Sequence, residues 1–371
     1  MDVILGGIEG GATHSKIVLY NGQGEKMAEC GGPGVNHWLF GMAECEKRIN
    51  GMVEEAKAAA KLPIDKPLAS LGMSLSGCEQ EETNKQLEDE LHELYPNLSS
   101  HYVVCSDTVG SIAAAHRHGG MVLIAGTGSN ALLLNPDGTQ SRCGGWGNML
   151  GDEGSAFWVS HKAVKIYFDD EDNLAKAPYD TSIVWQTIKD HFQVSNRFDL
   201  LEHCYSKFHK PKFAALCKKL AEEAKAGDPL CLWLFEQTGR ALATMVRALV
   251  PAAHKDLFLA DSGLPVVCVG SVWLSWDLLK NGFVSRLQEP PQNEGDQPVC
   301  ELSLLKLTTS MAVGATYLAA DAIGIDMPRD YRQNYTVFYH YKPQQRCECA
   351  GTSCAKIDTR QHPASSWCPC K

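Results

Sequence analysis

A carboxylate and a glycine-rich turn lie close together in residues 103–130. Asp107 follows an apolar run, and Gly126-Thr127-Gly128-Ser129-Asn130 follows a second one. A carboxylate at the C-terminal end of a strand projects into the space where open α/β sheets bind ligands. The turn offers backbone N–H groups and hydroxyls to a phosphate, because glycine lets the backbone approach closely. A base beside a phosphate cradle favours phosphoryl transfer to a hydroxyl group.

A second glycine-rich turn near the N-terminus strengthens this interpretation. Residues 3–9 and 15–20 predict two strands, joined by the turn Gly10-Gly11-Ala12-Thr13. The glycine spacing fits neither a Walker A loop nor a dinucleotide fingerprint. Alone, such a turn more often makes only a hairpin, but two facing turns can hold neighbouring phosphates from opposite sides. Glu9, just before the turn, could hold a water molecule on Mg²⁺.

The predicted strands and helices that position these two turns follow the same order in each half of the chain. Three antiparallel strands followed by α-β-α-β-α account for the first half, and the second half enlarges this order with helices over residues 154–250. Asn21-Gly22 predicts a type I′ hairpin turn, and a helix is expected from Ser271. We therefore expect a smaller N-terminal lobe, residues 1–118, and a larger C-terminal lobe, residues 119–341.

Composition limits the class of protein. At 371 residues the chain is long for one domain. A net charge of −10 argues against nucleic acid or an anionic membrane as a partner. We see no apolar run of the roughly 20 residues that a membrane span needs, and no signal peptide at Met1-Asp2. The scattered body cysteines predict a reduced, cytoplasmic protein.

The last segment, residues 342–371, has a different composition from the rest. It is rich in cysteine, including Cys347, Cys349, Cys368 and Cys370. Two C-x-C pairs invite a zinc site but do not have the usual C-x₂₋₄-C ligand spacing. We expect a disordered or aberrantly spliced tail and no metal site.

The paired glycine turns resemble those of the superfamily that contains actin, the heat-shock ATPases and the sugar kinases. This resemblance implies an α/β chain with the two-lobed actin-like ATPase (duplicated ribonuclease H-like) fold and central mixed sheets. A closer resemblance, to the N-acetylglucosamine kinase family, covers residues 6–341 and rests on a set of short blocks in a constant order. The blocks are NHWL (36–39), SLSG (74–77), SDTVGSIA (106–113), IAGTGSN (124–130), GGWG (144–147), GDEGSA (151–156) and VGSVW (269–273).

The resemblance implies transfer of the γ-phosphate of ATP, with Mg²⁺, to the 6-hydroxyl of N-acetylglucosamine in amino-sugar salvage. Asp107 would be the general base. The residues lining the sugar would be Asn36, Asp107, Ser129, Asn130, Gly145, Trp146, Gly147 and Asp152. Those at ATP would be Thr13, Thr127, Ala214, Ser271 and Ser275. The resemblance also implies a homodimer.

The residues themselves leave structural alternatives open. Asp107 could be a helix N-cap, Asn36 could cap a turn, and Asp152 could cap a helix near Gly154, because these residue types favour caps. Trp146 between glycines could be a packing residue instead of a platform for a pyranose ring.

Alternative functions also remain open from the sequence. The acceptor could be N-acetylmannosamine, glucose or a muramyl peptide, or the chain could be a non-catalytic ATP-binding regulator on the same fold. Two departures from the family pattern lie in the first turn: Ala12 replaces a usual glycine and His14 a usual arginine. A positive φ at Ala12 would strain the backbone.

Overall fold

Two mixed sheets form the centre of the protein, and the computed structural model describes residues 3–259, 262–291 and 297–343. The predicted tail, residues 342–371, lies almost entirely outside the described residues. In the first sheet the strand order is β3-β2-β1-β4-β5. Its strands and helices are β1 (Ile4–Gly10), β2 (His14–Asn21), β3 (Lys26–Pro33), α1 (His37–Phe40), α2 (Met42–Ala59), β4 (Ser70–Leu75), α3 (Glu81–Leu94), β5 (Tyr102–Ser106) and α4 (Asp107–Ala115).

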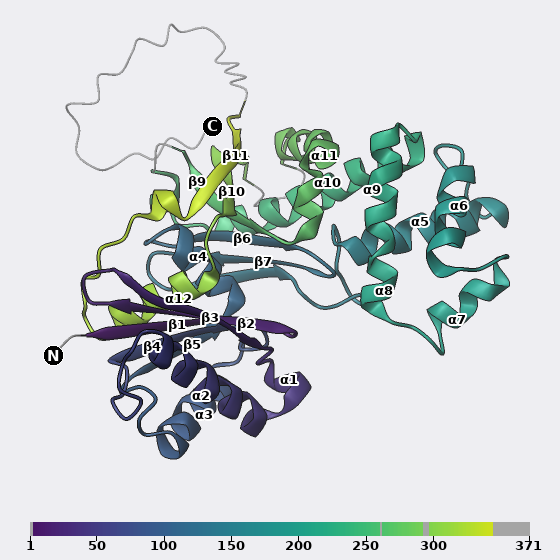
Figure 1. The fold of residues 1–371 in the computed structure, drawn as a ribbon. Coiled ribbons are helices and arrows are strands. Elements are labelled where there is room, and N and C mark those ends of the chain that lie inside the picture. Colours follow the sequence, from purple (N-terminus) through teal and green to yellow (C-terminus); the bar gives the residue numbers. More distant parts are fainter. Residues whose placement is uncertain (1–2, 260–261, 292–296, 344–371) are drawn as a thin grey trace, which may run out of the picture.

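The second sheet has the order β11-β10-β9-β6-β7-β8. Its elements are β6 (Gly120–Ala125), β7 (Ser129–Leu134), β8 (Gln140–Gly144), β9 (Leu264–Val269), α11 (Trp276–Gln288), β10 (Leu302–Leu307), α12 (Met311–Ala322) and β11 (Tyr335–Tyr341). A helical part, drawn to the right in Figure 1, is inserted between β8 and β9. It contains α5 (Ala156–Glu171), α6 (Ser182–Phe192), α7 (Leu201–Cys204), α8 (Lys210–Ala214), α9 (Leu216–Ala226) and α10 (Pro229–Leu249).

The two sheets repeat one topology, as the sequence predicted. β1 is antiparallel to β2 and parallel to β4, and β6 is antiparallel to β7 and parallel to β9. β4–β5 and β9–β10 continue each sheet in parallel. The second sheet differs by β11, which pairs antiparallel with β10 and was not predicted. The two-lobed actin-like fold expected from the resemblance is the fold observed; the lobe boundary near residue 118 stays a prediction.

The β2–β3 hairpin differs from the prediction at its turn. Positive φ occurs at Gly24 (81°) and not at Asn21 or Gly22, so the type I′ prediction was wrong. Gly24 N donates to Asn21 O over 3.0 Å, and the Asn21 side-chain oxygen accepts from two following N–H groups. The β7–β8 hairpin has the same construction, with Gly138 (φ 85°) donating to Asn135 O. The repeat therefore extends to the hairpin geometry.

Helices α4 and α12 lie between the two sheets (Figure 1). α12 packs against β1 and β4 at two glycines, where a β-carbon on Gly7 or Gly72 would lie 2.0 Å or 1.9 Å from a backbone oxygen of α12. The last helix of the second half is thus fixed to the first sheet. The helix predicted from Ser271 begins as a 3₁₀ turn over Ser271–Ser275 before α11.

Two further observations bear on the class of protein. Within the described residues no helix is long and apolar enough to cross a membrane. Nine of the ten described cysteines, all except Cys300, are free thiols, and burial raises the pKa of these nine, for example of Cys105 to about 12. The buried ones, Cys45, Cys78, Cys217, Cys231 and Cys268, pack as small apolar side chains.

Candidate functional site

Asp107 is the first residue of α4, directly after β5. Ser106, not Asp107, takes the N-cap position, so the alternative that Asp107 caps the helix was wrong. Burial, together with the nearby Glu79 and Glu9 carboxylates, raises the pKa of the Asp107 carboxyl to about 6. Among the described residues no Lys, Arg or His forms an ion pair with Asp107. This carboxylate is therefore poised to accept a proton near neutral pH.

The β6–β7 turn is tied to the start of α5. Ala156 N donates to Gly126 O over 2.8 Å, and Ser129 Oγ donates to Glu153 O over 2.8 Å. Ser129 N donates to Asp152 Oδ1 over 3.1 Å. Thr127, at the tip, is exposed. The turn thus presents Thr127 while Ser129 is held by the loop that follows β8.

Asp152 is buried and has a left-handed backbone, with φ 69°. It does not cap a helix, because Ser155 caps α5 by accepting from Trp158 N; that alternative was wrong. A β-carbon on Gly128 would lie 2.7 Å from Asp152 Oδ1, so the close approach requires glycine there. A strained backbone at a buried carboxylate is typical of functional sites.

The loop after β8 carries the other predicted sugar residues. Gly145 and Gly147 have φ of 76° and 79°, and a β-carbon on Gly145 would lie 2.8 Å from Asn130 Oδ1. Trp146 is 67% exposed, with the Arg142 guanidinium 5.3 Å from its ring centre. Trp146 is therefore not a core packing residue, and its face is available to a ligand.

Asn36 enters the site from the first lobe. Its Oδ1 accepts from Trp38 N over 2.9 Å and caps α1, as the structural alternative proposed. Trp38 Nε1 donates to Gly77 O over 3.1 Å, which joins this loop to the turn after β4. In the part of the chain that the structure describes, no group accepts from the Asn36 amide nitrogen. That amide can donate to a ligand.

Two of the buried side-chain acceptors that lack a hydrogen-bond donor within the described residues lie near this loop: Asn130 Oδ1 and Asp152 Oδ2. Nearly all buried polar groups in proteins are paired, by protein or by ordered water. Both belong to the loops around the Gly145–Gly147 segment, so Asn130 Oδ1 suits a hydroxyl of a ligand, and Asp152 Oδ2 could accept one beside its ionic contact with Lys210.

Four of the five predicted ATP residues line one cavity of about 420 Å³. They are Thr127, Ala214, Ser271 and Ser275, from three separate segments of the second half. Thr13 does not line this cavity; it lies exposed in the β1–β2 turn, where its carbonyl accepts from Gly34 N.

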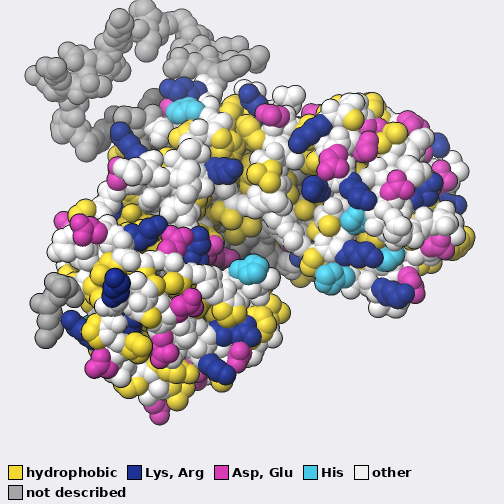
Figure 2. Space-filling view, in the orientation of Figure 1, with side chains coloured by type: hydrophobic (Ala, Val, Ile, Leu, Met, Phe, Trp, Pro, Cys, Tyr) yellow, Lys and Arg dark blue, Asp and Glu magenta, His cyan; other side chains and the backbone are white. Residues whose placement is uncertain are grey.

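A larger cavity of about 1010 Å³ opens between the two halves, where Figure 2 shows the surface hollowed. Glu9, His14 and Lys16 line it from the first sheet, and Gly270 and Ser310 from the second. Leu274 borders both this cavity and the smaller one. The residues expected at ATP therefore lie beside the space between the lobes.

The first turn tolerates the departure from the expected pattern at Ala12. Ala12 does not have a positive φ, so the expected backbone strain is absent. Glu9 Oε2 accepts from Ser310 Oγ and from Met311 N, over 3.1 Å for the latter. Glu9 thus joins the first sheet to the start of α12, a role that the sequence did not predict.

A sequence model of the BadF/BadG/BcrA/BcrD ATPase family matches residues 7–294. The chain belongs to this ATPase family. Membership agrees with ATP as the nucleotide.

Relatives of this ATPase include named amino-sugar kinases. An N-acetyl-D-glucosamine kinase of Dictyostelium discoideum is 24% identical over 326 residues, covering 85% of this chain and 97% of the relative. An N-acetylmuramic acid/N-acetylglucosamine kinase of Clostridium acetobutylicum is 27% identical, covering 57% of this chain and 72% of the relative. A solved structure from Chromobacterium violaceum, provisionally named an N-acetylglucosamine kinase, is 25% identical with a TM-score of 0.63, covering 85% of this chain and 99% of that one. The resemblance that the motifs predicted is confirmed.

Proposed function

We propose that this ATPase-family protein transfers the γ-phosphate of ATP to the 6-hydroxyl of N-acetylglucosamine. The observation that carries the proposal is the Asp107 carboxylate, which lies at the end of β5 without a cationic partner among the described residues. Amino-sugar kinase relatives that cover most of the chain support the substrate class. The same relatives favour an enzyme over the non-catalytic regulator.

In this mechanism Asp107 accepts the proton of the 6-hydroxyl as the oxygen attacks the γ-phosphorus in line. The bond from that phosphorus to the bridging oxygen breaks, and ADP leaves with the electron pair. A carboxyl with a pKa of about 6 is ionised at neutral pH and still basic enough to accept the proton. Asn36, Asn130 and Asp152 would orient the sugar through its other polar groups.

The nucleotide would lie mainly against the second lobe. Ala214, Ser271 and Ser275 would border its adenosine part in the smaller cavity, and Thr13 and Thr127 would contact phosphates from the two turns. Closure of the lobes would exclude water, whose attack would hydrolyse ATP without forming product.

Mg²⁺ would accompany ATP. The described residues contain no cluster of three or more His, Cys, Asp or Glu side chains suited to a metal ion. This fits Mg²⁺, which keeps several waters and is held mainly by substrate phosphates with one or two carboxylates. Glu9 would be that carboxylate, since only its Oε2 is committed to α12. The metal would neutralise charge on the transferred phosphate.

A substrate panel tests the proposal. ADP release would be measured with N-acetylglucosamine, N-acetylmannosamine, glucose and a muramyl peptide, and the product would be located by phosphorus–proton coupling in NMR spectra. We expect the highest kcat/KM for N-acetylglucosamine and phosphate on its C6 oxygen. Equal use of glucose would contradict the amino-sugar assignment, and ATP turnover without a phosphorylated sugar would favour the regulator. A homodimer and a cytoplasmic location, implied by the resemblance and the reduced cysteines, stay predictions.

A further inference from the structure

The buried carboxylate of Asp152 has one cationic neighbour that the sequence did not indicate. Lys210 Nζ lies 2.7 Å from Asp152 Oδ2, as an ion pair without hydrogen-bond geometry. The Asp152 side chain is only 3% exposed and that of Lys210 29%. No other carboxylate in the ion pairs of the described residues is as buried, the next being Asp169 at 21%. A buried carboxylate stays ionised only when a partner compensates its lost hydration.

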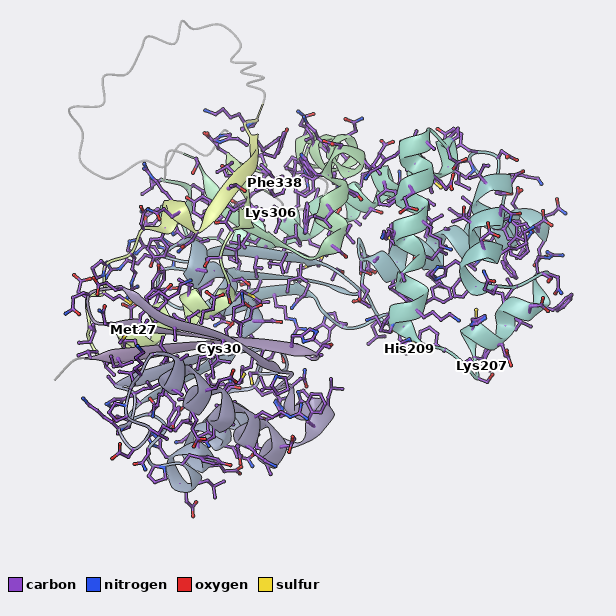
Figure 3. The ribbon with its side chains drawn as sticks, in the orientation of Figure 1. Met27, Cys30, Lys207, His209, Lys306 and Phe338 are labelled. Carbon is purple, nitrogen blue, oxygen red and sulfur yellow. The ribbon has the colours of Figure 1, made fainter. Side chains whose placement is uncertain are left out.

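Lys210 is the first residue of α8, the short helix that borders the smaller cavity. Pro211 and Ala214 of this helix line the cavity together with Thr127. Phe213 anchors α8 in the core, where its ring lies 5.4 Å from Phe157 and 5.2 Å from Phe192. Figure 3 labels Lys207 and His209, which come just before α8 in the chain and lie at the lower edge of the helical part. A ligand in the cavity would therefore contact the helix that carries Lys210.

The ion pair connects the expected nucleotide site to the expected sugar site through a series of contacts. On one side α8 borders the cavity; on the other Asp152 Oδ1 accepts from Ser129 N, two residues after Thr127. A displacement of α8 would move the Lys210 ammonium relative to Asp152. It would therefore change the electrostatic environment of the carboxylate that is expected to bind a sugar hydroxyl. At 2.7 Å in a buried setting, this electrostatic contact depends strongly on distance.

We propose that Lys210 is a positioning residue that couples nucleotide binding in the α8 cavity to sugar binding at Asp152. The proposal rests on the proposed function, because it requires a sugar at Asp152 and a nucleotide beside α8. It assigns Lys210 no contact with the reacting atoms. Coupling of this kind is reciprocal: each ligand changes the affinity for the other by the same factor.

The experiment measures the Kd of N-acetylglucosamine by calorimetry, with and without a saturating non-hydrolysable ATP analogue. In the parent protein we expect the analogue to lower the sugar Kd by about 5- to 150-fold, the usual range for coupled sites. In Lys210→Met this factor should fall to near one, while the analogue still binds in the absence of sugar. Lys210→Arg, which keeps the charge, should restore part of the factor.

The matched control is Lys207→Met in the same segment. Lys207 pairs with Glu202 over 2.9 Å at the surface, with both side chains more than half exposed, so its loss should leave the factor unchanged. Asp152→Asn removes the other partner, and Lys210→Met in that background should have no further effect on the factor. If Lys210→Met fails to fold, Lys210→Arg and Asp152→Asn still decide the question.

Two results would overturn the coupling while leaving the proposed function intact: a parent protein that phosphorylates the sugar without any effect of the analogue on sugar Kd, or a Lys210→Met variant with the parental factor. A parent protein that binds nucleotide but no N-acetylated sugar would overturn both proposals. Sugar phosphate formation by the parent, measured in parallel, separates these cases.

Discussion

Gly314 of α12 lies directly against Gly110 of α4: a β-carbon on Gly314 would come within 2.1 Å of the Gly110 carbonyl oxygen. The two helices occupy equivalent places in the repeat, each following the last parallel strand of its half. α4 begins with Asp107, and the start of α12 is held by Glu9. The contact therefore fixes the position of Asp107 relative to both sheets.

Gly314→Ala should destabilise the protein, because its β-carbon meets backbone atoms that cannot rotate away. Overpacking of this kind costs about 1–3 kcal/mol, and more where backbone must move. Urea denaturation would measure the loss. Gly51→Ala is the matched control: Gly51 is inside α2 with nothing within 4 Å of its β-carbon position, and alanine should stabilise that helix by about 0.5–1 kcal/mol. Parental stability of Gly314→Ala would contradict the contact.

The pH dependence of activity should report Asp107. Because the base must be ionised, kcat/KM for the sugar should fall as the pH drops through about 6, the raised pKa of Asp107, instead of near its usual 3.8. Glu79 is the second cause of that raised pKa, after burial. Glu79→Gln should therefore move the acidic limb to lower pH while the plateau stays unchanged.

Glu82→Gln, a neighbouring exposed position on α3, is the control for the Glu79 variant, since Glu82 is not among the causes of the Asp107 shift. An acidic limb below about pH 5 in the parent protein would show that another group, with a pKa nearer the normal carboxyl range, limits the rate.

Thr127→Val tests the β6–β7 turn. If the Thr127 hydroxyl donates to a nucleotide phosphate, its removal loses a hydrogen bond to a charged group, worth about 1.5–3 kcal/mol. The kcat/KM for ATP should then fall roughly ten- to a hundred-fold, with sugar Kd nearly unchanged. Thr83→Val, whose hydroxyl contacts Gln80 at the surface, should have no effect. An unaltered ATP dependence would place the phosphates away from this turn.

Much of the fold follows from local patterns in the sequence. Apolar runs and turns placed the strands of both sheets, and the repeated order predicted the shared topology. The hairpin turn was wrong because Asn21 bonds the following N–H groups with its own side chain, which moves the positive φ to Gly24. β11 was missed although Tyr335–Tyr341 is rich in the aromatic and β-branched residues that favour strands, because the repeated order predicted no strand after the last helix.

The candidate site was predictable where a sequence block or the family resemblance identifies its residues. Thr127, Ala214, Ser271 and Ser275 meet at one cavity although they come from three separate segments. Lys210 was not predictable, because its partner Asp152 lies 58 residues earlier in the chain, and only the packing of α8 brings them together. Glu79 was missed for a similar reason: its effect on Asp107 depends on the relative placement of β4 and β5.

The central claim is that Asp107 is the base for sugar phosphorylation. Asp107→Asn keeps the size of the side chain but cannot take the proton, so kcat should fall by about 10²- to 10⁴-fold. Sugar Kd, measured by calorimetry, should change far less. The deciding measurement is therefore kcat for N-acetylglucosamine 6-phosphate formation by Asp107→Asn beside its sugar Kd. A large loss of kcat with retained binding is the predicted result, and a fully active variant would contradict the account.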